Sequence, residues 1–151
     1  MFVAGHSEGG IHAIRVAAAA PTELAGILYL SSAARTMAAT ILTQLEGNLR
    51  GAHLSEGVVT GQMATLRQAM DDFLAGRPVD PSKVSPFPPV QQLFAGLVAP
   101  VTAPLMRGLL GFDPAPAAAA LPLPALVLAG GKDVQIDPDL DAHLLERAIR
   151  D

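Results

Sequence analysis

Near its start the chain reads Val3-Ala4-Gly5-His6-Ser7-Glu8-Gly9-Gly10, and this segment constrains the architecture more than any other. The apolar residues 2–4 before Gly5 are typical of a short buried strand, and residues 8–20 after it have the composition of a helix. Pro21 ends that helix because proline cannot continue one. A strand, a glycine-rich turn and a helix in this order predict a crossover unit of a parallel sheet.

The spacing Gly5-x-Ser7-x-Gly9 predicts a nucleophile elbow, a sharp turn that lifts a serine hydroxyl above the sheet edge. We expect both glycines to be required because a Cβ at either position would strike the neighbouring strand or helix, and we expect Gly10 to extend the close packing. Ser7 is therefore the candidate nucleophile. The backbone N–H of Glu8, next to the positive end of the helix, is the candidate oxyanion donor.

Two further apolar runs, residues 27–30 and 125–129, predict strands parallel to the first. None of the three runs alternates with polar residues, and such continuous runs favour strands covered on both faces. A last helix is expected over 138–149, where Asp139 and Asp141 suit the positive end of the helix dipole.

The middle of the chain has a different pattern. Apolar residues recur every four positions in two runs between residues 35 and 74, which predicts two amphipathic helices separated near 51–57. Residues 78–104 are rich in proline, and 113–124 form an Ala/Pro connector with no expected helix. We therefore expect an α/β core over 1–34 and 116–151, interrupted by a mostly helical cap over 35–115. Met63, Met70 and Phe73 are candidate lining residues of this cap, although such a stripe is more often ordinary core.

A serine nucleophile needs a base, and the base needs a carboxylate that orients it. Asp133 is the best candidate acid because it follows the third predicted strand, at the same sheet edge as Ser7. The alternative is that Asp133 only stabilises a turn after Gly130-Gly131. Asp137 is the second candidate acid, but Asp137-Pro138 is more typical of a helix start.

None of the four histidines fits the role of the base. His6 lies inside the elbow, His12 lies on the following helix with an expected structural role, and His53 is expected to be solvated in the insertion. His143 lies within the last helical pattern, where a catalytic histidine on a loop is not expected.

Composition excludes several other classes of function. The net charge of −4 comes without a basic stripe, so nucleic acid is not an expected partner, and the absence of cysteine excludes disulfides and thiolate metal sites. The acidic residues Asp133, Asp137, Asp139 and Asp141 lack the spacing of a Ca²⁺ loop, so neither a metal nor a cofactor is expected. No secretory signal is visible, and the density of prolines argues against a membrane span in the two long uncharged segments. The expected location is cytoplasmic or unknown. The sequence leaves the oligomeric state open.

The segments 3–10 and 123–136 resemble the nucleophile elbow and the acid-bearing strand of the α/β-hydrolase superfamily. The form Gly-His-Ser-Glu-Gly-Gly, followed later by Gly-Gly-Lys-Asp, is similar to serine esterases and acyl-peptidase-like members. The resemblance implies a partial α/β-hydrolase fold, with Ser7 as nucleophile, Glu8 N–H as one oxyanion donor and Asp133 as acid, acting on a small acyl substrate. It assigns no catalytic histidine, because the family places that residue after one further strand.

The resemblance thus leads us to expect the C-terminal part of such a hydrolase, with negligible esterase activity on its own. Two alternatives remain open. The same elbow serves thioesterases, acyltransferases and haloperoxidase-like enzymes, and an inactive hydrolase-like chain can act as a binding module.

Overall fold

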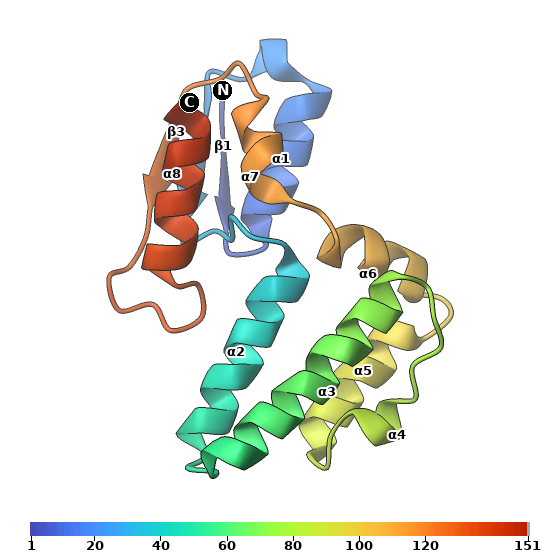
Figure 1. Ribbon diagram of the computed structural model, residues 1–151. Coiled ribbons are helices and arrows are strands. Elements are labelled where there is room, and N and C mark those ends of the chain that lie inside the picture. Colours follow the sequence, from blue (N-terminus) through green and yellow to red (C-terminus); the bar gives the residue numbers. More distant parts are fainter. Residues whose placement is uncertain (151) are drawn as a thin grey trace. The chain divides into compact units, whose positions relative to one another are not determined.

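The computed structural model describes residues 1–150, which form a mixed α/β structure with one three-stranded parallel sheet (Figure 1). The chain divides into two compact units, which are described separately below. The first unit comprises residues 1–40 together with the chain from 113 onward, and the second comprises residues 41–112. The sheet lies in the first unit, and the second unit is helical.

The sheet consists of β1 (Phe2–His6), β2 (Gly26–Leu30) and β3 (Ala125–Leu128), in the order β1-β2-β3. Val3 lies opposite Ile27, and Tyr29 lies opposite Val127. The three strands predicted from apolar runs are therefore confirmed to within two residues. Because all three strands run in the same direction, the residues that follow them meet at one edge of the sheet.

Three helices of the first unit pack together beside the sheet: α1 (Gly9–Ala19), α7 (Pro114–Ala119) and α8 (His143–Arg150). Short helical turns at Pro21–Glu23 and Pro138–Ala142 come after α1 and before α8. Figure 1 shows α7 and α8 side by side in front of the strands. The core of the unit consists of buried apolar residues of the helices and of the strand β2, chiefly Ile11, Ile14, Ala17, Ile27, Tyr29 and Leu145.

The other face of the sheet is not covered by a helix of the first unit. Successive residues of a strand point to opposite faces, so Phe2, Leu126 and Leu128 lie on the side opposite Ile27 and Tyr29. Phe2 is 64% exposed, Leu126 49% and Leu128 50%, whereas Tyr29 is 1% exposed. The prediction of strands covered on both faces is wrong for this unit. Continuous apolar runs show that both faces are apolar, but they do not say what covers each face.

The helical unit contains most of α2 (Met37–Gly51), followed by α3 (Glu56–Leu74), α4 (Pro81–Val84), α5 (Pro88–Val98) and α6 (Ala103–Leu110). The two amphipathic helices predicted before residue 74 are confirmed as α2 and α3. Met63, Met70 and Phe73 are at most 2% exposed, so they form core rather than the lining of an open site. Val59, Leu66, Phe94 and Leu110 of this unit are also at most 2% exposed.

The proline-rich segments contain more helix than their composition predicts. The helices α4, α5, α6 and α7 each have a proline in their first turn, where a missing N–H breaks no hydrogen bond. The expectation of an Ala/Pro connector over 113–124 is therefore wrong, because Pro114 begins α7 and Ala115 and Ala118 are buried. Proline in this chain marks where helices begin as well as where they end.

No single helix in the described part of the chain has the length and hydropathy needed to cross a membrane. One pair, α5 with α6, passes the same test jointly by length and composition, with a bend of 104° between the two helices.

Candidate active site

Ser7 lies in the turn between β1 and α1, where its backbone has a φ of +53°. This left-handed conformation is uncommon for a residue with a Cβ, and it persists only where the surrounding structure enforces it. Two hydrogen bonds do so here. The Ser7 N–H donates to the Leu30 carbonyl of β2 at 3.0 Å, and the Gly10 N–H donates to the Ser7 carbonyl at 3.1 Å. The turn therefore has the strained geometry that the glycine spacing predicts.

The glycines around Ser7 are required at Gly5 and Gly10 but not at Gly9. A Cβ on Gly5 would lie closer than 3.0 Å to the backbone of Gly9 and Gly10, and a Cβ on Gly10 would strike the Ser32 side chain. A Cβ on Gly9 would meet no atom within 4 Å. The prediction for Gly5 is confirmed and the prediction for Gly9 is wrong, because Gly9 begins α1 with its Cβ direction in open space.

Glu8 lies at the N-terminus of α1, with helical φ and ψ of −54° and −30°. Within residues 1–150, its backbone N–H donates to no protein acceptor. An unpaired N–H beside Ser7, at the positive end of an 11-residue helix, is suited to bind a developing negative charge. The Glu8 side chain points elsewhere and contacts the His12 imidazole at 3.1 Å on the exposed side of α1.

Asp133 lies in the loop after β3, at the same sheet edge as Ser7. Its Oδ1 accepts hydrogen bonds from the N–H groups of Gln135 at 2.9 Å and Ile136 at 3.0 Å. These two bonds lower the pKa of the Asp133 carboxyl below its ordinary value, and the Ser31 hydroxyl and the charge of nearby His6 lower it further. Asp133 is therefore a firmly ionised carboxylate at neutral pH, as an acid that orients a base must be.

The same two backbone bonds also match the alternative role considered for Asp133. An aspartate that accepts from the N–H groups two and three residues later stabilises its own turn. Both bonds end on Oδ1. Asp133 would therefore use Oδ2 to accept a hydrogen bond from the base that it orients.

Ser31 is a residue of this edge that the sequence did not single out. It follows β2 with a φ of +42°, and its N–H donates to the Leu128 carbonyl of β3 at 2.7 Å. Its hydroxyl hydrogen-bonds to Asp133 and lies 3.5 Å from the Gly130 N–H. The position of Ser31 after an apolar strand, equivalent to that of Ser7 after β1, is the signal that could have identified it.

The four histidines lie where none contacts the Ser7 hydroxyl, which receives no hydrogen bond from the part of the chain that is described. His6 and His53 are exposed. His12 is exposed on α1, and its Nε2 lies 3.1 Å from a carboxylate oxygen of Glu8, one turn earlier in the chain. His143 begins α8, 3.8 Å from Asp139 and 3.7 Å from Glu146.

The two later aspartates have different roles. Asp137 accepts from the N–H groups of Asp139 at 2.9 Å and Leu140 at 3.3 Å, which confirms that it begins the last helical segment. Asp141 lies in the first turn of the segment Pro138–Ala142, as the sequence predicts, but it also has a role that the sequence does not indicate. Its carboxylate is fully buried and pairs with Arg35 at 2.8 Å.

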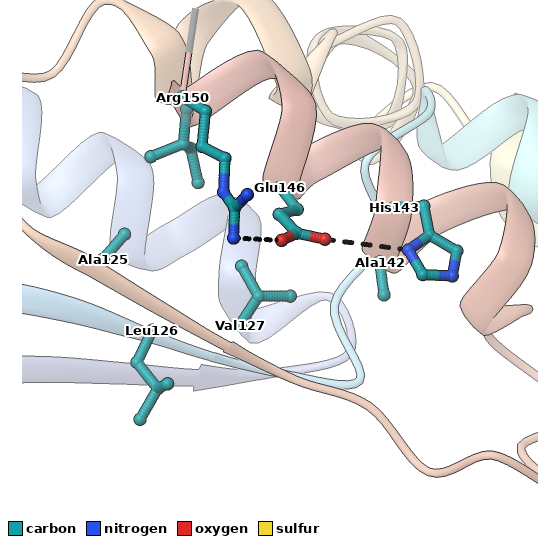
Figure 2. Close-up of a pocket in the computed structure, with 8 residues that line it drawn as sticks. Ala125, Leu126, Val127, Ala142, His143, Glu146 and Arg150 are labelled. Carbon is teal, nitrogen blue, oxygen red and sulfur yellow. Dashed lines mark ion pairs between the residues drawn. The ribbon is translucent and has the colours of Figure 1, made fainter.

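A cavity of about 370 Å³ lies between β3 and α8, away from Ser7 and Asp133. Figure 2 shows Glu146 between His143 and Arg150 along one side of this cavity, with Val127 directed toward α8. Leu126 points to the opposite side of β3, which is the uncovered face. The cavity is thus bounded by the free edge of the sheet and does not belong to the Ser7 site.

The fold and the site define a mixed α/β protein with a strained serine turn at the carboxyl edge of a parallel sheet. No protein-family model matches the chain, and no curated protein sequence matches it. Two solved structures from Mycobacterium tuberculosis are similar to it. The protein Rv0554 is 19% identical with a TM-score of 0.47, and the match covers 98% of this chain and 53% of Rv0554. BpoC, named as a candidate non-heme bromoperoxidase, is 21% identical with a TM-score of 0.46, and the match covers 98% and 54%. The chain thus spans about half the length of both proteins, and neither likeness assigns an activity to it.

Proposed function

We propose that Ser7 is the nucleophile of a serine hydrolase that cleaves ester, thioester or amide bonds. The observation that supports this most directly is the left-handed backbone of Ser7 between β1 and α1, with the Gly5 position too crowded for a Cβ. A turn of this kind presents a side chain above the sheet. Its strain lowers the stability of the fold, and strain of this kind is concentrated at functional sites.

In this proposal the Ser7 oxygen attacks the acyl carbon, and the negative charge that develops on the acyl oxygen is stabilised by the Glu8 N–H and the positive end of α1. The leaving group departs with a proton, and water then releases the acyl group from Ser7. Asp133 is assigned to orient the protonated base. No histidine among residues 1–150 contacts Ser7, so the imidazole is assigned to another segment or another chain.

The test uses a fluorophosphonate probe on the 151-residue chain, with imidazole added to the solution in place of the unassigned base. In the labelling step the Ser7 oxygen bonds to phosphorus, fluoride leaves and the hydroxyl proton passes to imidazole. We expect labelling at Ser7, located by peptide mass spectrometry, that increases with imidazole and disappears in Ser7→Ala. Without imidazole we expect negligible turnover of p-nitrophenyl acetate.

Ser31 provides the matched control, because it is the other left-handed serine at this edge of the sheet. Labelling at Ser31 rather than Ser7, or a Ser7→Ala variant labelled as strongly as the parent chain, would overturn the proposal.

The uncovered sheet face favours the second candidate function, a binding module. Phe2, Leu126 and Leu128 are each about half exposed or more, and a soluble protein rarely leaves such residues contiguous without a partner. Labelling that is equally absent from the parent chain and from Ser7→Ala, at saturating imidazole, would favour this second function over hydrolysis.

A further inference from the structure

Asp141 is a fully buried carboxylate with four hydrogen bonds, all to two neighbouring residues. Its Oδ1 accepts from the Ala34 N–H at 3.0 Å, the Arg35 N–H at 3.2 Å and the Arg35 Nε at 3.2 Å. Its Oδ2 accepts from the Arg35 Nη2 at 2.8 Å. Three donors share Oδ1 and a fourth bonds to Oδ2, so both carboxylate oxygens are tied to residues 34 and 35.

The backbone that Asp141 holds leads directly from the turn formed by Ser31 and Ser32. This turn contacts both parts of the candidate active site. The Ser32 hydroxyl donates to the Gly5 carbonyl at 3.0 Å, next to the elbow, and the Ser32 side chain occupies the space that a Cβ on Gly10 would need. On its other side, the Ser31 hydroxyl hydrogen-bonds to Asp133.

Stability alone does not explain this arrangement. A buried ion pair gains little net free energy over well-packed apolar residues, because both charges lose their hydration. An apolar pair could fill the same volume, but it could not hold two successive backbone N–H groups in a fixed position. The bonds to the Ala34 and Arg35 backbone therefore indicate that the path of the chain is what Asp141 controls.

We propose that Asp141 is a positioning residue of the Ser7 site: by holding the backbone at Ala34 and Arg35, it fixes the Ser31–Ser32 turn between the nucleophile elbow and Asp133. This inference rests on the proposed hydrolase function for its catalytic consequence, but its geometric content is independent of that function. A shift of about 1 Å in such a support can cost on the order of a hundredfold in rate.

The experiment compares Asp141→Ala combined with Arg35→Ala, which removes both charges together, with Asp141→Asn, which keeps the shape of the side chain. Leu145→Ala is the control, since Leu145 is a fully buried residue of α8 that makes no side-chain hydrogen bond. Urea titrations at several temperatures give the stability that each variant has lost. The variants are then compared at a temperature at which the control and the Asp141 variants have lost equal stability. Two quantities are then measured: the Asp133 carboxyl pKa by carbon NMR, and the rate of fluorophosphonate labelling at Ser7 in imidazole.

We expect the double variant to raise the pKa of Asp133 toward its ordinary value and to slow labelling of Ser7 at least about tenfold. Asp141→Asn should change both quantities in the same direction by less, because its amide oxygen can still accept from the two backbone N–H groups. Leu145→Ala should change neither.

An unchanged Asp133 pKa in both folded Asp141 variants would overturn the inference, and so would a Leu145→Ala control that reproduces their effect. If the parent chain is not labelled at Ser7, the proposed hydrolase function fails, while the pKa of Asp133 still decides whether Asp141 positions the turn.

Discussion

Replacing Gly5 with alanine places a methyl group against backbone atoms of Gly9 and Gly10, at less than 3.0 Å. Backbone atoms at the start of a helix cannot rotate away as a flexible side chain can, so either β1 or α1 must shift. Inserting a single carbon into a packed site costs about 1–3 kcal/mol, and because the struck atoms are backbone we expect about 3 kcal/mol for Gly5→Ala.

Gly9→Ala is the matched control, since the same methyl group meets no atom there. Gly9 begins α1, where alanine restricts the unfolded chain more than glycine does. We therefore expect Gly9→Ala to be neutral or to stabilise the protein by about 0.4–1 kcal/mol. Each variant adds one methyl group, and the two sites are only four residues apart. Their free energies of unfolding should nevertheless differ by about 3 kcal/mol or more.

The assay is urea unfolding followed by the fluorescence of Tyr29. The chain has one tyrosine and no tryptophan, and Tyr29 lies in β2, so this signal reports the first unit alone. The slope of each transition should remain constant while its midpoint moves. Midpoints for Gly5→Ala and Gly9→Ala that agree within about 0.5 kcal/mol would refute the steric reasoning, and a destabilised Gly9→Ala would refute the assignment of open space at that position.

Two further predictions concern the sheet. Burial raises the pKa of Tyr29 from 10.0 to about 12. Because the tyrosine of the unfolded chain ionises first as the pH rises, the folded protein should lose up to about 3 kcal/mol of stability between these two pH values. A phenolate absorbance titration of the folded protein with a midpoint near 10 would contradict this. Leu128→Lys, on the uncovered face, should change the free energy of unfolding by less than about 1 kcal/mol, whereas Ile27→Lys on the covered face should unfold the first unit. Equal losses of stability in the two lysine variants would contradict the assignment of faces.

The order of strands and helices follows from the sequence because local composition determines it. The apolar runs and the four-residue spacing located β1–β3, α2 and α3 without any knowledge of distant contacts. The same holds for Ser7, whose strained turn is specified by a glycine two residues before it and a helix directly after it. The exceptions are α4, α5 and α7, where prolines that begin a helix were interpreted as prolines that prevent one.

The remaining features depend on contacts between distant residues. Arg35 and Asp141 are 106 positions apart, and no periodicity relates them. The need for glycine at position 10 arises from Ser32 on a neighbouring strand end, which the five-residue motif does not include. The contact between Ser31 and Asp133 likewise exists only once β2 and β3 have paired.

The insertion of residues 41–112 between β2 and β3 also determines when the parts of the site can form during folding. β1 and β2 are joined by a short crossover through α1, so the Ser7 turn depends on contacts close in sequence, which form early. β3 reaches β2 only after a loop of roughly ninety residues has closed, and this costs little extra free energy but slows pairing. A newly made chain therefore completes its serine turn before β3 brings the carboxylate of Asp133 to the same edge of the sheet.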